Sequence, residues 1–318
     1  LIEFLLGIIF LTIIGFFFYV FSITNYSINL SALLFGLIIY LVKRDNNLKK
    51  IEISTFLLLI FMFAGILISK THEDYIPYHF QYIDIISNSE FLLGLGNLET
   101  TFLYASFFSY LQKLFVIPLF NYKLLHVPVF LIFFSICLFL FQEVFIKKKF
   151  NILNLLLLLF FLTKFSRLSE YGYDYVAGFV LLSILIIFYF TKNNSLKSSP
   201  SLILLLFLYA ISIKITSLFF LPIFLLFFYK SLIEENVSIK KYLIKNYKNI
   251  IPIFVFILLI IFDNFSRSGC LFYFIELTCS NKNIIPWTIN FMDVSEIGDK
   301  IHLSAKGYYH QSIISDDP

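Results

Sequence analysis

The stretch that decides the fold runs from residue 122 to residue 146 and reads YKLLHVPVFLIFFSICLFLFQEVFI. Its only Lys, Arg, Asp or Glu residues are Lys123 near the beginning and Glu143 near the end. A helix needs about 20 predominantly apolar residues to cross the hydrocarbon core of a bilayer. The stretch therefore predicts a membrane-spanning helix.

The same apolar pattern recurs along the whole chain. Apolar runs occupy residues 1–24, 28–42, 51–68, 101–120, 122–146, 150–165, 175–191, 200–213, 215–229 and 249–265. Of the 318 residues, 59% are hydrophobic and 14% are charged, whereas soluble domains carry about 25% charged residues. A single soluble core of this size cannot bury so much apolar surface. We expect an all-α, polytopic transmembrane helical bundle with about nine or ten apolar segments.

Lysine and arginine predict the orientation of the bundle. Four segments, at residues 43–50, 147–149, 192–197 and 230–248, hold more than half of the 24 cations, and such segments face the cytoplasm. The transmembrane domain would then span 1–265, with an outer loop at 69–121 and an extracytoplasmic tail at 266–318. The run 101–120 is interrupted by Gln112, Lys113 and Pro118, so we expect it to lie in the interface or re-enter. The chain starts at Leu1 inside an apolar run, which is consistent with a fragment.

The outer loop opens on a polar cluster that suggests chemistry. His72, Glu73, Asp74 and His79 lie within eight residues, directly after an apolar helix. A carboxylate that is partly desolvated at a membrane boundary has a raised pKa, which suits a general base. The alternative is a solvated helix end with an acidic cap.

The residues that follow predict an interfacial platform. Residues 81–90 have the spacing of a short amphipathic helix, with Phe80, Ile83 and Ile86 on one face. The sequence Gly-Leu-Gly-Asn at 94–97 then predicts a tight turn. An acidic pair, an interfacial helix and a glycine turn together favour a platform for a lipid-linked substrate.

These motifs carry a resemblance to a known superfamily. The motifs are His72-Glu73-Asp74-Tyr75, Tyr78-His79-Phe80, Gly94-Leu95-Gly96-Asn97, Ser268-Gly269-Cys270, Thr278-Cys279 and Pro286-Trp287. Over residues 65–290 the chain resembles the GT-C superfamily of polytopic glycosyltransferases, and within it a bacterial group linked to cell-surface polysaccharide synthesis. It departs from that group at Glu73, where the group has Asp, and at Phe274, where the group has Pro.

The resemblance implies a reaction and its partners. It implies transfer of a sugar from a polyprenyl-phosphate donor to a glycan or lipid acceptor, at the outer face of a multi-pass protein of the bacterial inner membrane. Asp74 would be the base, with Glu73 as its partner or as ligand of a divalent metal ion. His72 and His79 would orient a phosphate or hold that metal, although their spacing is not a recognised metal motif. No other cofactor is implied.

Three further residues are candidates for substrate contact. Lys214 lies between two short apolar runs, and Arg267 follows the last run; either cation could clamp the donor phosphate, since charges at such positions are usually functional. The alternatives are a snorkelling lysine and an interfacial anchor. Asp174 opens an apolar run, where a carboxylate caps a helix N-terminus, and capping competes with a role in sugar binding.

Cys270 and Cys279 lie in the tail that we place outside the membrane. An oxidising compartment would favour a disulfide between them, and two unpaired small residues are the alternative. Cys137 lies inside an apolar run and is expected to pack there.

Several other functions are excluded or left open. The sequence contains no glycine-rich phosphate loop and no nucleophile elbow, and no basic stripe that would bind nucleic acid. A transporter or flippase for a lipid-linked saccharide stays an alternative to the glycosyltransferase. So does a non-catalytic scaffold for polysaccharide assembly.

Overall fold

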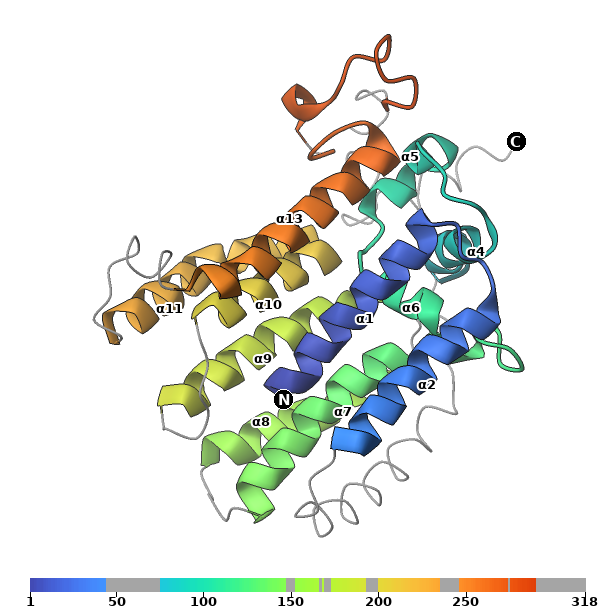
Figure 1. Ribbon diagram of the computed structural model, residues 1–318. Coiled ribbons are helices and arrows are strands. Elements are labelled where there is room, and N and C mark those ends of the chain that lie inside the picture. Colours follow the sequence, from blue (N-terminus) through green and yellow to red (C-terminus); the bar gives the residue numbers. More distant parts are fainter. Residues whose placement is uncertain are drawn as a thin grey trace, which may run out of the picture. The chain divides into compact units, whose positions relative to one another are not determined.

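The fold is helical throughout the residues that the computed structural model describes, namely 1–43, 75–146, 152–165, 168, 173–192, 200–234, 246–273 and 275–289. The α-helices within these ranges are α1 (Ile2–Val20), α2 (Tyr26–Lys43), α4 (Gln81–Asn88), α5 (Leu95–Leu98), α6 (Ser109–Leu114), α7 (Val127–Phe141), α8 (Ile152–Thr163), α9 (Asp174–Lys192), α10 (Pro200–Ile213), α11 (Leu221–Glu234) and α13 (Tyr247–Ser268) (Figure 1). These ranges contain two isolated β-bridges and no strand. The all-α prediction is confirmed.

Three helical segments of the described chain are long and apolar enough to cross a membrane. They are Ile2–Val20, Tyr122–Phe145 and Tyr247–Ser268. Shorter apolar helices cover Tyr26–Ile39, Ile152–Thr163, Tyr175–Phe190, Pro200–Ile213 and Ile215–Lys230. The apolar run 51–68 lies outside the described residues. Length and composition thus indicate a membrane protein.

The chain divides into two compact units, of which the first contains residues 1–91 and 106–256. Within it, α7 packs against α1, α8 and α9, and α10 packs against α9 and α11 (Figure 1). The short helix α6 packs against α1, α2 and α4. The first unit is therefore a bundle of largely apolar helices.

A glycine lets α1 approach α6 closely. A Cβ atom at Gly15 would lie 2.0 Å from the backbone oxygen of Tyr110, far inside van der Waals contact. Phe16 and Tyr19, on the same buried face of α1, pack their rings against Tyr110 at centroid distances of 5.0 and 5.9 Å. The absence of a side chain at Gly15 is thus what brings the backbones of α1 and α6 together.

The run 101–120 does not form one long helix. It is broken into a 3₁₀ turn (η3, Thr100–Tyr104), the six-residue α6 and a turn in which Leu119 and Asn121 have positive φ. The side chains from Ser106 to Val116 are nevertheless all buried. A segment of irregular backbone is thus enclosed by helices of the first unit, which matches the prediction that this run does not cross as a single helix.

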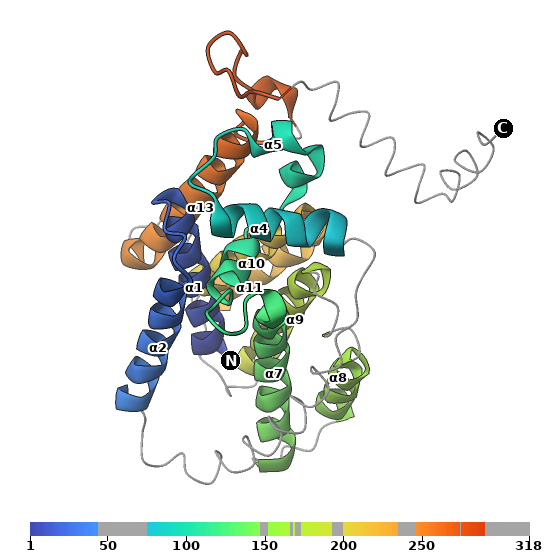
Figure 2. The ribbon, with the colours of Figure 1, turned by 90° about the vertical axis from the view of Figure 1, so that its right-hand side faces the viewer.

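The amphipathic helix predicted after the acidic cluster is α4. Its buried residues are Tyr82, Ile83, Ile86 and Ser87, so the predicted apolar face is confirmed for Ile83 and Ile86. Figure 2 shows α4 lying crosswise to α2 and α7. An amphipathic helix on a membrane surface would have this orientation relative to helices that cross the membrane, and the interfacial position of α4 stays a prediction.

The second unit contains residues 92–105 and, among the described residues, 257–289. The predicted glycine turn lies here, with Gly94 at φ +76, a conformation that favours glycine. A Cβ at Gly94 would lie 2.7 Å from Cβ of Trp287, and Asn97 donates a hydrogen bond to the Trp287 carbonyl at 2.7 Å. The turn therefore packs directly against the chain at Trp287.

Candidate functional site

The predicted site residue His79 meets a loop that is distant in the sequence. Its ring packs edge-to-face against the ring of Tyr173, with 4.4 Å between centroids. The hydroxyls of Tyr78 and Tyr173 are hydrogen-bonded to each other. Both His79 and Tyr173 are buried. The π-helical turn Tyr75–Phe80 (η2) thus contacts the residue directly before α9.

Ser106 and Phe107 join this contact to a third part of the chain. The backbone N–H of Ser106 donates to the Tyr173 hydroxyl at 3.3 Å. The next N–H, from Phe107, donates to the carbonyl of Ser212 at 3.0 Å. Ser212 lies in the last turn of α10, two residues before Lys214. We call Ser106 and Phe107, with these two hydrogen bonds, the junction.

Lys214 occupies a break between two helical segments. It has an extended backbone (φ −148, ψ 119) between the end of α10 at Ile213 and the 3₁₀ turn η7 (Ile215–Phe220) that leads into α11. The carbonyl of Ala210 accepts two hydrogen bonds at the break, from the backbone N–H of Lys214 and from the Ser217 hydroxyl, each at 3.0 Å. The side chain of Lys214 is half-buried.

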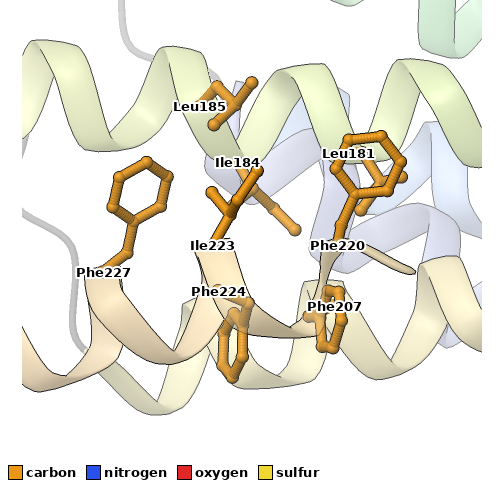
Figure 3. Close-up of a pocket in the computed structure, with 8 residues that line it drawn as sticks. All are labelled: Leu181, Ile184, Leu185, Phe207, Phe220, Ile223, Phe224 and Phe227. Carbon is orange, nitrogen blue, oxygen red and sulfur yellow. The ribbon is translucent and has the colours of Figure 1, made fainter. Parts of the chain in front are cut away.

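An apolar pocket lies along the helices that meet at this break (Figure 3). It is lined by Leu181 of α9, Phe207 of α10, Phe220 of η7 and Phe224 of α11, among other residues of the same four elements. Every lining side chain is leucine, isoleucine or phenylalanine. Phe207 lies seven residues before Lys214, which is about 10 Å along a helix. This lining favours contact with hydrocarbon over contact with water.

The remaining residues of the predicted acidic cluster lie outside the described part. His72, Glu73 and Asp74 directly precede Tyr75, where the description resumes. Asp174 is the first residue of α9 and follows Tyr173; its position at the helix start suits the capping role. The structure therefore connects the segments that contain His79, Asp174 and Lys214, through contacts of Tyr173 and Ser212 with Ser106 and Phe107. The roles of Glu73 and Asp74 stay predictions.

Arg267 lies in the second unit, and its guanidinium is fully engaged by protein acceptors. One terminal nitrogen pairs with the Asp263 carboxylate at 2.7 Å and with Asn264 Oδ1 at 3.2 Å. The other donates to the carbonyls of Phe102 at 3.1 Å and Ala105 at 2.7 Å, and Nε donates to the Asp263 carbonyl. Because these contacts use all five N–H donors, a phosphate at Arg267 would have to displace one of them.

The cysteines of the tail are paired in the structure. Cys270 and Cys279 form a disulfide, and the backbone N–H of Leu271 donates to the Thr278 carbonyl at 3.1 Å across the same loop. Tyr273 within this loop packs edge-to-face on Tyr104. Burial raises the pKa of Tyr273 to about 12, and the nearby charge of Arg267 acts in the opposite direction.

Among the described residues, no group of three His, Cys, Asp or Glu side chains is arranged to hold a metal ion. Two carboxylates and one histidine of the predicted cluster lie outside that search. The divalent ion thus stays a prediction.

Sequence reasoning missed a polar network on the first unit. The Asp84 carboxylate accepts hydrogen bonds from the Tyr122 hydroxyl at 2.5 Å and from the Asn88 amide at 2.7 Å, and Tyr26 donates to Asn88 at 2.5 Å. Asp84 and Asn88 are spaced i, i+4 on α4, which is the one signal visible in the sequence. The network fixes α4 to the start of α2 and to the segment before α7.

A family model covers residues 1–316 of the chain and is described as a domain of unknown function, DUF8201. The chain belongs to the DUF8201 family. No curated protein and no solved structure matches this DUF8201 chain. Its function is therefore argued from the contacts described above.

Proposed function

We propose that the protein is an integral-membrane glycosyltransferase, GT-C-like in fold, that moves a sugar from a polyprenyl-phosphate donor to a glycan or lipid acceptor outside the cytoplasm. The observation that carries the proposal is the junction. Through it, the turn that follows the acidic cluster, the residue before Asp174 and the last turn of α10, two residues before Lys214, meet around Ser106 and Phe107.

The surroundings of Lys214 support an amphiphilic donor. A half-buried lysine on a helix break is a suitable group to bind a phosphate, because cations near lipid are usually functional. The apolar pocket that includes Phe207 and Phe224 begins about two helical turns away. A phosphate at Lys214 would let the attached hydrocarbon chain lie along α9, α10 and α11.

The chemistry assigns a proton transfer to Asp74. The acceptor hydroxyl attacks the anomeric carbon, its proton passes to the Asp74 carboxylate, and the bond from that carbon to the phosphate oxygen breaks with inversion. The polyprenyl phosphate leaves with the electron pair, and Lys214 stabilises its charge. Glu73 would orient Asp74, or would hold a divalent ion whose charge would favour the ionised carboxylate. Base catalysis of this kind contributes about 100-fold or more to a rate.

The test compares two carboxylates of the same outer loop. Asp74→Asn should lower transfer of a radiolabelled sugar from polyprenyl phosphate, in membranes that contain the full chain, by about 100-fold or more. Glu90→Gln is the matched control, since Glu90 is exposed just after α4, and it should keep transfer within about twofold of the wild type. Normal transfer by Asp74→Asn would overturn the assignment of the base.

A second function is favoured by a different observation. The helix break at Lys214 and the buried irregular segment 106–116 are features of transporters, which bind substrates at discontinuous helices. A flippase for a lipid-linked saccharide would translocate a labelled polyprenyl saccharide in reconstituted vesicles and form no glycosidic bond. That result would replace the first proposal.

A further inference from the structure

Lys113 is a buried lysine whose amine has no hydrogen-bond acceptor. Its side chain is 1% exposed, and Nζ has no hydrogen-bond partner among the described residues. The amine lies 5.4 Å from the centroid of the Tyr19 ring of α1. A cation–π contact offsets only part of the cost of burying an ammonium without an acceptor.

Hydrogen bonds and close packing fix the backbone around Lys113, whereas its amine makes no hydrogen bond with the described residues. The Asn29 amide of α2 donates to the carbonyl of Lys113 at 3.0 Å and to that of Val116 at 2.9 Å. Gly15 of α1 brings the backbone of α1 against α6 at Tyr110. The contacts that hold α6 against α1 and α2 thus include hydrogen bonds from the Asn29 amide and close backbone packing, and they do not involve the Lys113 amine.

No described charge on the neighbouring elements compensates an ammonium at this position. Among the side chains that the structure describes on α1, α2 and α4, the titratable ones are Glu3, Tyr19, Tyr26, Tyr82 and Asp84. Glu3 is exposed at the far end of α1, and the Asp84 carboxylate accepts from Tyr122 and Asn88. The Tyr82 hydroxyl is bonded to that of Tyr110 on α6 itself. Burial consequently lowers the pKa of Lys113 to about 7.

From this geometry we propose that Lys113 is a proton-controlled latch for α6. As a neutral amine it stays packed on Tyr19 and keeps α6 seated on α1 and α2. As an ammonium it favours an open state in which its amine reaches water, and α6 moves out together with the junction at Ser106 and Phe107. An effect of this opening on sugar transfer rests on the proposed function, whereas the latch itself does not.

The direction of the pH effect follows from proton linkage. The open state, with Lys113 in water, keeps an ordinary lysine pKa of about 10.5, whereas the closed state has a pKa of about 7. Between these two values the open state binds more protons, so closing is favoured as the pH rises. Below about pH 7 both states are protonated, and the balance between them no longer depends on this group.

Hydrogen–deuterium exchange on the full chain in lipid nanodiscs tests the latch without any activity assay. Peptides that cover residues 106–116 should be about 50-fold better protected at pH 9 than at pH 7, after correction for the intrinsic exchange rate. Lys113→Met, which fills the same space without a charge, should be well protected at both pH values. Lys123→Met alters an exposed lysine and should keep the pH dependence of the wild type.

Two outcomes would overturn the latch. One is a wild-type protein whose corrected protection at 106–116 is equal at pH 7 and pH 9. The other is a Lys113→Met variant that keeps the wild-type pH dependence. Lys113→Gln serves if the methionine variant does not fold, and it should lose the pH dependence in the same way.

Discussion

The ring of His79 packs edge-to-face on the ring of Tyr173, with 4.4 Å between centroids. The first belongs to the turn that follows the acidic cluster and the second to the loop before α9. Tyr173 also accepts the backbone N–H of Ser106 through its hydroxyl. This one phenol therefore connects the turn Tyr75–Phe80, the start of α9 and the buried segment that leads to α6.

Removal of the Tyr173 hydroxyl is the first prediction. Tyr173→Phe keeps the ring against His79 but leaves the buried N–H of Ser106 without its acceptor, which costs about 1–3 kcal/mol. We expect a lower thermal midpoint in detergent and a loss of sugar transfer. Tyr229→Phe removes a hydroxyl from an exposed side chain and should change neither. A Tyr173→Phe protein with wild-type stability would show that the Ser106 contact is unimportant.

The buried ion pair of the second unit gives another prediction. In Arg267→Lys the side chain cannot donate to the carbonyls of Phe102 and Ala105 and to the Asp263 carboxylate at the same time. The reason is that the three donors of a lysine are all on one nitrogen atom. Loss of one partner of a buried pair costs about 3–5 kcal/mol. Chemical denaturation of Arg267→Lys and Asp263→Asn should show this loss.

An exposed residue of the same unit provides the comparison. Lys282→Met should unfold at the same denaturant concentration as the wild type, since Lys282 lies at the surface. Should Arg267→Lys match it, the guanidinium would be available to a ligand such as the donor phosphate.

The number of free thiols in the protein can be measured directly. The chain has 3 cysteines, of which Cys270 and Cys279 are paired and Cys137 is free. Maleimide labelling in denaturant should therefore modify Cys137 alone, and all three after reduction. The ring is short, so its loss should cost less than about 3 kcal/mol. Labelling of all three cysteines before reduction would contradict the disulfide.

Local patterns in the sequence predicted the elements that depend on neighbouring residues. The spacing of Ile83 and Ile86 predicted the buried face of α4, and the polar interruption at Gln112 and Lys113 predicted that the run 101–120 does not cross as one helix. The break at Lys214 was visible as a boundary between two apolar runs. In each case the signal lies within a few residues, because helix periodicity and helix ends are local properties.

Contacts between distant segments could not be predicted in this way. Nothing in the tail indicates that Trp287 packs on Gly94, and nothing near His79 indicates Tyr173. The sequence identified Lys113 only as an interruption of the run 101–120, whereas the side chain is buried against α1, which Gly15 allows to approach α6 closely. A single sequence records which side chains are apolar but not which of two apolar faces will meet.

The two glycines of α1 provide a matched final prediction. A Cβ added at Gly7 meets nothing within 4 Å, so Gly7→Ala should stabilise the protein by up to about 1 kcal/mol through the better helix propensity of alanine. A Cβ added at Gly15 would lie 2.0 Å from the Tyr110 oxygen. That oxygen belongs to the backbone of α6, so the clash is relieved only if α6 moves.

Gly15→Ala should therefore lower the stability by about 1–3 kcal/mol, as overpacking of a core does, against the gain in helix propensity. Thermal unfolding in one detergent, with Gly7→Ala beside it, measures both signs in the same helix. Because α6 carries Lys113, the displaced helix should also expose its amine, and exchange at residues 106–116 should lose its dependence on pH. A Gly15→Ala protein as stable as Gly7→Ala would mean that α1 and α6 do not pack through this glycine.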